Sequence, residues 1–107
     1  MTDLVIVLTT MPESGADELA AALVGERLAA CVNVHAPMRS TYRWQGAFET
    51  EPERQLVIKT TAERLPALEA RLQQLHPYEL PEFLVMRVER GSERYEAWVR
   101  ENVAIKS

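Results

Sequence analysis

The alternation of apolar and polar positions predicts a strand followed by a helix at the start of this chain. Residues 4–8 form an unbroken apolar run of mostly β-branched side chains, which is typical of a central strand buried on both faces. Apolar residues then recur at intervals of three and four positions over residues 15–28, which predicts an amphipathic helix. We expect Ser14 to cap this helix, because Asp17 stands three residues later in the capping-box position.

The middle of the chain predicts a long β-hairpin. An extended pattern at residues 31–34 is followed by β-forming side chains that alternate in direction over residues 40–44. Residues 45–47 indicate a tight turn, and a returning strand covers residues 48–60 with an interruption at Pro52. We expect this hairpin to project past the body of the domain.

The rest of the chain predicts a helix over residues 64–75, a strongly apolar strand over residues 83–88 and a last short helix opened by Gly91 and Ser92. The order β-α-β-β-α-β plus a terminal helix is the ferredoxin-like plan of the α+β class. In this plan both main helices cover one face of an antiparallel sheet. The other face is left bare, so we expect self-association.

Composition narrows the class of protein. The 107 residues are enough for a single domain, residues 1–107, and 47% of them are hydrophobic. Acidic residues outnumber basic ones by 16 to 12, which argues against a nucleic-acid partner. The chain lacks a signal-peptide pattern and a membrane span, so we expect a cytoplasmic protein with no membrane partner. A single cysteine excludes an internal disulfide.

Residues 76–82 are the most concentrated source of candidate chemistry. This segment places His76, Tyr78, Glu79 and a second carboxylate between two prolines, after a helical pattern and before a strand pattern. Proline rings restrict the backbone, so the side chains are presented in a set arrangement. The alternative is that the prolines merely end a helix and begin a strand, with His76 capping the last helical carbonyls.

The side chains that could bind a metal ion are scattered along the sequence. Cys31, His35 and His76 are the borderline or soft ligands, and they lack the paired spacing of a structural zinc site. A site would have to recruit carboxylates such as Glu79 or Glu82, or ligands from a second subunit. Imidazole suits Cu(II) and Zn(II), whereas Cu(I) prefers thiolate.

Other residues leave more than one interpretation open. Cys31 is either a small core residue or, with a histidine, a nucleophile, although no nucleophile motif surrounds it. Lys59 either holds an anion near a helix N-terminus or pairs with a hairpin glutamate. Tyr42, Trp44 and Phe48 near the hairpin tip favour subunit packing over base stacking, because acidic residues flank them.

Taken in order, several short motifs resemble the CutA divalent-cation tolerance family over about residues 4–98. They are Val7-Leu8-Thr9-Thr10 with Pro12, Arg27-Leu28-Ala29-Ala30-Cys31-Val32-Asn33, Ser40, Tyr42, Trp44, Gly46, Glu49, Glu53, Ile58-Lys59-Thr60, His76-Pro77-Tyr78-Glu79 with Pro81-Glu82, and Gly91, Tyr95 and Trp98. The resemblance implies a ferredoxin-like fold and a homotrimer in which long hairpins wrap around neighbouring subunits. It also implies an architecture like that of the PII signalling proteins, a role in tolerance to copper or another divalent cation, and no enzymatic activity.

The chain departs from the copper site assigned in some bacterial members of that family. That site uses a cysteine near the end of the first strand and two consecutive histidines before the proline, where this chain has Thr9 and Leu75-His76. Only His76 matches, so we expect any metal to be bound by His76 with Glu79 or a residue of another subunit. A second hypothesis is a PII-like signalling or scaffold trimer that binds a small ligand or a protein partner. Its ligand cleft would include Cys31, Tyr42, Lys59, His76, Tyr78 and Glu79. A third hypothesis is an enzyme that uses Cys31 or His76.

Overall fold

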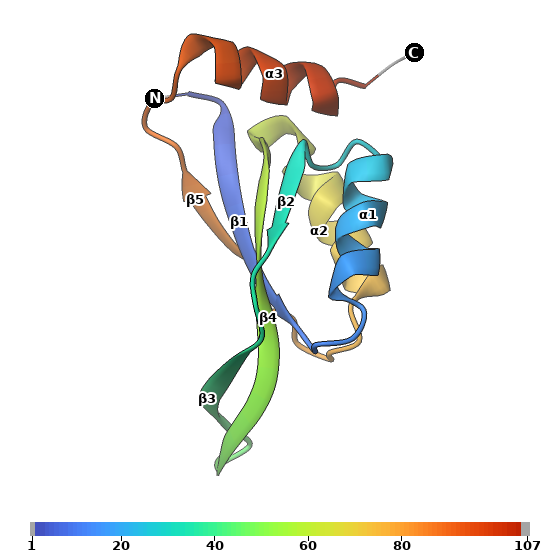
Figure 1. Cartoon of the computed structure of the whole chain (residues 1–107), viewed down its shortest axis with the longest axis vertical. Helices are drawn as coiled ribbons and strands as arrows, with labels where there is room; N and C mark the ends of the chain where they lie inside the picture. Colours follow the sequence, from blue (N-terminus) through green and yellow to red (C-terminus); the bar gives the residue numbers. More distant parts are fainter. Residues whose placement is uncertain (1, 106–107) are drawn as a thin grey trace.

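A single antiparallel sheet organises the molecule (Figure 1). The computed structural model describes residues 2–105. Its strands are β1 (Leu4–Met11), β2 (Cys31–Val34), β3 (Met38–Trp44), β4 (Ala47–Thr61) and β5 (Leu84–Arg87), in the order β2-β4-β1-β5, with β3 paired to β4 alone. This order confirms the ferredoxin-like plan, while residues 1, 106 and 107 of the predicted domain lie outside the described residues.

Two helices cover one face of the sheet, as predicted. They are α1 (Ala16–Gly25) and α2 (Leu65–Leu75), the second preceded by a short 3-10 helix, η1 (Ala62–Arg64). A third helix, α3 (Glu93–Val103), crosses the end of the sheet opposite the hairpin (Figure 1). No helix within residues 2–105 is long and apolar enough to cross a membrane.

The core lies between the sheet and helices α1 and α2. Alternate residues of the two central strands point towards the helices and are fully buried there, together with leucines at helical spacing: Val5, Val7, Leu56, Ile58, Leu23, Leu68 and Leu72. The opposite side of β1 is only half-buried. The prediction that this strand is buried on both faces is therefore wrong for a single chain, because no element within residues 2–105 covers most of that face.

The hairpin extends well beyond the sheet and makes the molecule 44 Å long (Figure 1). Gln45 and Gly46 have φ angles of 50° and 81°, which is the type I′ combination that closes a two-residue hairpin loop. Pro52 does not interrupt β4. Pairing between β1 and β4 ends at Arg54, so Pro52 lies where β4 has β3 as its sole neighbour and a missing N–H is tolerated.

The first helix begins and ends differently from the sequence prediction. Gly15, with φ +93°, is the N-cap residue, and no side chain caps the helix, so the assignment of Ser14 as the cap is wrong. The left-handed conformation of Gly15 turns the chain directly from β1 into α1. The helix ends at Gly25 instead of residue 28, because Arg27 adopts a φ of 60° and the next two N–H groups both bond to the Leu23 carbonyl.

Candidate functional site

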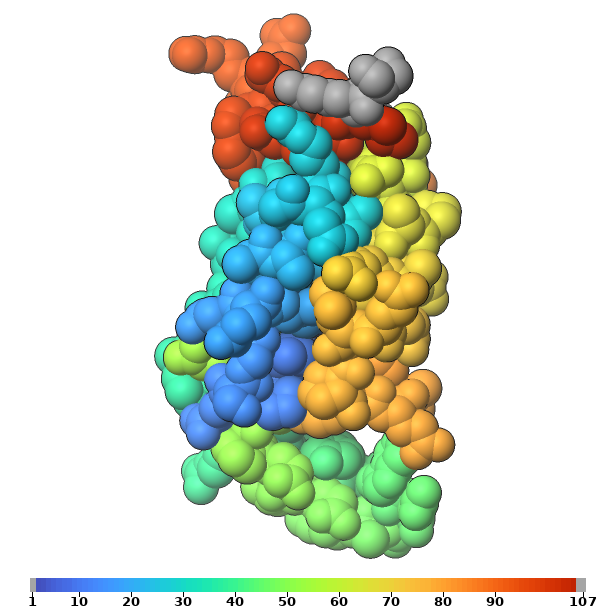
Figure 2. Space-filling view, turned by 90° about the vertical axis from the view of Figure 1, so that its right-hand side faces the viewer, coloured from blue at the N-terminus to red at the C-terminus, as the bar shows by residue number. Residues whose placement is uncertain are grey.

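A cleft separates the hairpin from the segment that follows α2. It has a volume of about 830 Å³. In Figure 2 the orange segment after α2 overhangs the green hairpin with a hollow between them. The lining residues come from β1, both hairpin strands and the proline-flanked segment: Thr10, Ser40, Thr41, Tyr42, Trp44, Glu53 and residues 77–82. Most of the segment singled out in the sequence thus forms one wall of this cleft.

His76 lies behind that wall and is only 7% exposed. It ends α2 with an extended backbone, as expected for a residue that precedes a proline. Its Nε2 lies 2.7 Å from the Thr10 carbonyl oxygen, which can only accept, so Nε2 carries the proton. Its Nδ1 accepts the Tyr78 N–H at 3.1 Å. Both nitrogens of this neutral ring are therefore occupied, and the ring fastens the segment to β1. His76 is also the C-cap of α2, because its backbone N–H donates to the Leu72 carbonyl at 2.8 Å.

Tyr78 joins the segment to the hairpin strand β4. Its hydroxyl donates to Oε2 of Glu53 at 2.6 Å, the short distance of a hydrogen bond to a charged acceptor. Burial, followed by the hydrogen bond and charge of Glu53, raises the pKa of Tyr78 well above its ordinary value. Burial, followed by the hairpin glutamates 51, 49 and 53, also raises the pKa of Tyr42. Both phenols therefore stay neutral over the physiological range.

Glu82 connects the proline-flanked segment to the sheet through Gln55. Gln55 of β4 donates from Nε2 to the Thr9 carbonyl at 2.9 Å and to Oε2 of Glu82 at 3.2 Å. Glu79, in contrast, is exposed at the cleft. Hydrogen bonds thus tie the segment to β1 and β4 at three side chains, His76, Tyr78 and Glu82, and the cleft wall is held in place.

Known proteins share both the motifs and the fold of this chain. The family described as CutA1 divalent ion tolerance protein matches residues 5–102. The chain belongs to the CutA1 family. The divalent-cation tolerance protein CutA of Thermus thermophilus is 45% identical over 98 residues, covering 91% of this chain and 95% of that protein. The protein of the same name from Yersinia pestis is 42% identical over 96 residues, covering 89% and 81%.

Solved CutA structures have the same fold. CutA from Xylella fastidiosa matches with a TM-score of 0.92 and 42% identity, covering 95% of this chain and 99% of that chain. CutA from Synechococcus elongatus PCC7942 matches with a TM-score of 0.91 and 46% identity, covering 97% and 93%. The family resemblance stated from the sequence motifs is confirmed.

The three positions that the sequence resemblance implied as metal ligands, 9, 75 and 76, are not arranged around an open site. Thr9 is fully buried, and its hydroxyl has no hydrogen-bond partner among the described residues. Leu75 supplies no donor atom, and both nitrogens of His76 are already bonded. Within residues 2–105, no three His, Cys, Asp or Glu side chains are grouped to hold a metal ion. A metal at His76 would therefore have to displace one of its hydrogen bonds.

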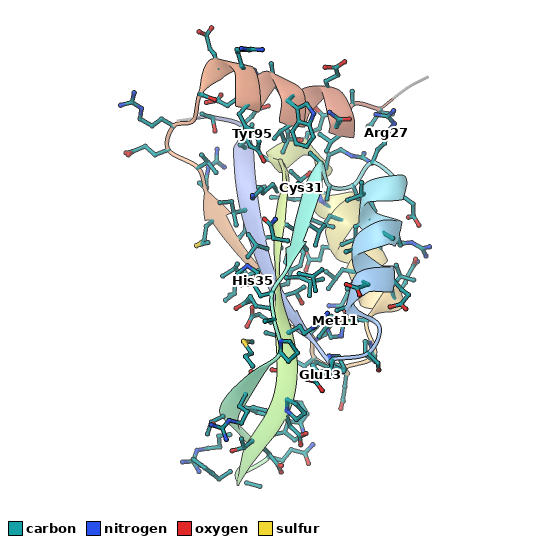
Figure 3. The ribbon with its side chains drawn as sticks, viewed as in Figure 1. Met11, Glu13, Arg27, Cys31, His35 and Tyr95 are labelled. Atoms are coloured by element: carbon teal, nitrogen blue, oxygen red, sulfur yellow. The ribbon has the colours of Figure 1, made fainter. Side chains whose placement is uncertain are left out.

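Cys31 and Lys59 lie away from the cleft. They face each other across β2 and β4, in the row that continues to Ile6 of β1. Figure 3 shows Cys31 near the α3 end of the sheet, far from the hairpin. Within one chain the structure therefore brings together Tyr42, Tyr78 and Glu79 but not these two residues. None of the ion pairs within residues 2–105 joins Lys59 to a hairpin glutamate.

The three aromatic residues predicted to contact other subunits lie in two different environments. Tyr42 and Trp44 line the cleft, whereas Phe48 is 74% exposed at the hairpin tip. The sequence indicates Glu53 as a partner for Lys59, as one of the acidic residues that flank the hairpin aromatics and as part of a family motif. Hydrophobic periodicity in the sequence could not show that Glu53 is the buried acceptor of the Tyr78 hydroxyl. This contact forms only because the segment after α2 folds back onto the hairpin.

Proposed function

We propose that this protein acts in tolerance to divalent cations, as a cytoplasmic homotrimer that binds a cation and catalyses no reaction. The observation that carries the proposal is the match to the CutA1 divalent ion tolerance family over residues 5–102, with relatives named divalent-cation tolerance proteins at 42–45% identity. Copper is the first ion to test, because Cu(II) has a strong preference for imidazole.

The bare side of the sheet supports assembly into a trimer. In one row across the strands Leu8 lies between Val57 and Leu84, and in the next row Ile6 lies between Lys59 and Met86. Leu84 is 55% exposed and Met86 is 46% exposed, whereas Val85 pairs with Val7 and so lies on the face towards the helices. A contiguous apolar surface of this kind marks an interface, and covering it would also protect the free edge of β5.

Direct metal binding at the proline-flanked segment is the finer part of the proposal. Glu79 is an exposed carboxylate three residues after His76. Since His76 must give up a hydrogen bond before it can coordinate, we expect a weaker site than one with free imidazoles. A ligand from another subunit would complete the coordination.

Calorimetric titration with Cu(II) and Zn(II) tests this site. Glu79→Gln removes an exposed charge without affecting the core, and His76→Ala removes the imidazole. The chain has two histidines, and the exposed His35 provides the matched control, His35→Ala. We expect binding to weaken at least about tenfold in the first two variants and to be unchanged in the third.

Binding that is unaffected by both Glu79→Gln and His76→Ala would contradict a metal site at this segment. Because His76 is buried, circular dichroism must accompany its variant. If that variant is unfolded, the result for Glu79→Gln decides the question alone. Sedimentation equilibrium of the unmodified protein tests the trimer separately, and a monomer at micromolar concentration would contradict it.

A further inference from the structure

We infer that the cleft between the hairpin and residues 77–82 binds an organic cation, namely an ammonium or guanidinium group carried on an apolar body. Its volume of about 830 Å³ is in the range of sites for drug-sized molecules. Three features of the lining carry the inference: an uncompensated buried carboxylate, aromatic walls and the absence of basic residues.

Glu53 is the buried carboxylate. It is 6% exposed and lines the cleft. The Tyr78 hydroxyl is its hydrogen-bond donor, and none of the ion pairs within residues 2–105 involves Glu53. Taking a carboxylate out of water without a countercharge is costly, so a cation entering the cleft would compensate a charge that no ion pair of residues 2–105 neutralises.

Aromatic side chains stand on both sides of this carboxylate. Tyr42 and Trp44 project from the same face of β3, two residues apart, and Tyr78 lies on the opposite wall. The faces of such rings attract cations, above all where water is excluded. Pro77, Leu80 and Pro81 add apolar surface to the second wall. This lining suits a ligand with an apolar body as well as a charged end.

The remaining charges of the lining have the same sign. Glu79 and Glu82 are at the cleft, and among the described residues 2–105 no lysine, arginine or histidine lines it. The cleft therefore selects against anions. It also differs from the proposed metal site, which needs His76 and a ligand from another subunit and shares only Glu79 with the cleft lining. An organic cation needs one carboxylate and aromatic surface.

Fluorescence titration with phenethylamine tests the inference. The chain has two tryptophans, so a Trp98→Phe background leaves Trp44 in the cleft as the reporter. The titration is done on the assembled protein in the presence of a chelator, and 2-phenylethanol serves as the neutral probe of the same shape. We expect saturable binding of the amine, and at least about tenfold weaker binding of the alcohol, because the alcohol lacks the charge.

Two glutamate variants separate a contact from a general acidic field. Glu53→Gln keeps the shape and a hydrogen-bond acceptor for Tyr78 but removes the charge, and should weaken amine binding at least about tenfold. Glu101→Gln, on α3 at the end of the sheet opposite the hairpin, removes one exposed charge outside the cleft lining and should leave binding within about twofold of the parent.

Three results would overturn the inference: no binding of the amine to the assembled protein, equal binding of the alcohol, or equal losses in the two glutamate variants. The first result is also what a second copy of the chain filling the cleft would produce. If Glu53→Gln does not fold, Trp44→Leu in the Trp98→Phe background replaces it. Calorimetry then measures amine binding, and this variant must bind the amine more weakly than the parent. None of these outcomes depends on the metal site, because a chelator is present throughout.

Discussion

At the scale of single residues, three side chains decide how the proline-flanked segment is used. The His76 ring joins β1 to the backbone of Tyr78, and the Tyr78 hydroxyl joins the segment to Glu53 of β4. The two rings also pack together, with centroids 4.8 Å apart. His76 thus contributes to the position of Tyr78, and Tyr78 satisfies the buried carboxylate of the cleft.

Removing the Tyr78 hydroxyl should therefore destabilise the fold. We expect Tyr78→Phe to lower the free energy of unfolding by about 1–3 kcal/mol, because it leaves the buried Glu53 carboxylate without its donor. Tyr95 is exposed on α3, and its hydroxyl has no hydrogen-bond partner within residues 2–105. It provides the matched control, and Tyr95→Phe should stay within about 0.5 kcal/mol of the parent. Urea unfolding at neutral pH measures both.

The same pair predicts a dependence on alkaline pH. The folded state raises the pKa of Tyr78, whereas the unfolded chain has the ordinary value of 10.0. The stabilisation is thus fully present below pH 10.0 and is lost as the pH rises towards the folded value. Ultraviolet titration of the phenols should show a strongly alkaline phase that Tyr78→Phe removes. An unchanged titration curve in the variant would contradict the Glu53 contact.

At the scale of elements, the junction between β1 and α1 depends on a single backbone conformation. Gly15 has φ +93°, and a methyl group there would lie 3.4 Å from Cε of Met11. The contact is tolerable, but the left-handed conformation is not favourable for a side chain. Here the element boundary is set by the backbone alone, since no side chain caps the helix.

Two glycine variants of the same helix test this argument. Gly15→Ala should lower the free energy of unfolding by about 1–2 kcal/mol, because alanine is strained at this φ. Gly25→Ala at the other end meets no atom within 4 Å and has no positive φ. It should be neutral or stabilising by up to about 1 kcal/mol. Thermal unfolding of both proteins compares them, and equal effects would show that backbone strain is not the cause.

At the scale of the whole molecule, the sheet has one covered and one open face. Helices α1 and α2 bury one side, while Ile6, Leu8, Val57, Leu84 and Met86 remain partly or largely exposed on the other. A chain of this size gains stability when association covers such a surface. In the proposed trimer, neighbouring subunits and their long hairpins would cover the open face of the sheet.

A charge on the open face should weaken assembly. Leu84→Glu places a carboxylate in the apolar row beside Leu8, and we expect at least about tenfold weaker association, because the charge must be desolvated on assembly. Val24→Glu, also exposed but on α1, is the matched control and should leave the assembly intact. Sedimentation equilibrium distinguishes the two, and an unchanged assembly in Leu84→Glu would place the interface elsewhere.

Much of the fold could be predicted from the sequence because its signals are local. The leucines of α2 recur at helical spacing, and the apolar residues of β1 and β4 occupy alternate buried positions, so element type and order followed directly. The failures also have local causes. Ser14 was a plausible cap, but Gly15 adopts a conformation that begins the helix without one, and Pro52 was tolerated because of its place at the edge of the sheet.

The candidate site was predictable only in part. The composition of the segment 76–82 singled it out, and most of it lines the cleft, yet the sequence could not show that the His76 nitrogens are occupied by Thr10 and Tyr78. Nor could it show that Glu53 is buried beneath Tyr78 while Cys31 and Lys59 lie elsewhere. These facts depend on contacts between residues far apart in the chain.

By itself, the sequence determined the elements, their order and the family, because hydrophobic periodicity and ordered short motifs are properties of neighbouring residues. The tertiary structure alone decided which polar groups are satisfied and which remain available. Folding the proline-flanked segment against β1 and the hairpin occupied His76, buried Glu53 without a cation and opened the cleft beside the aromatic residues. Burial and hydrogen bonding between distant segments determine what each of these side chains can bind.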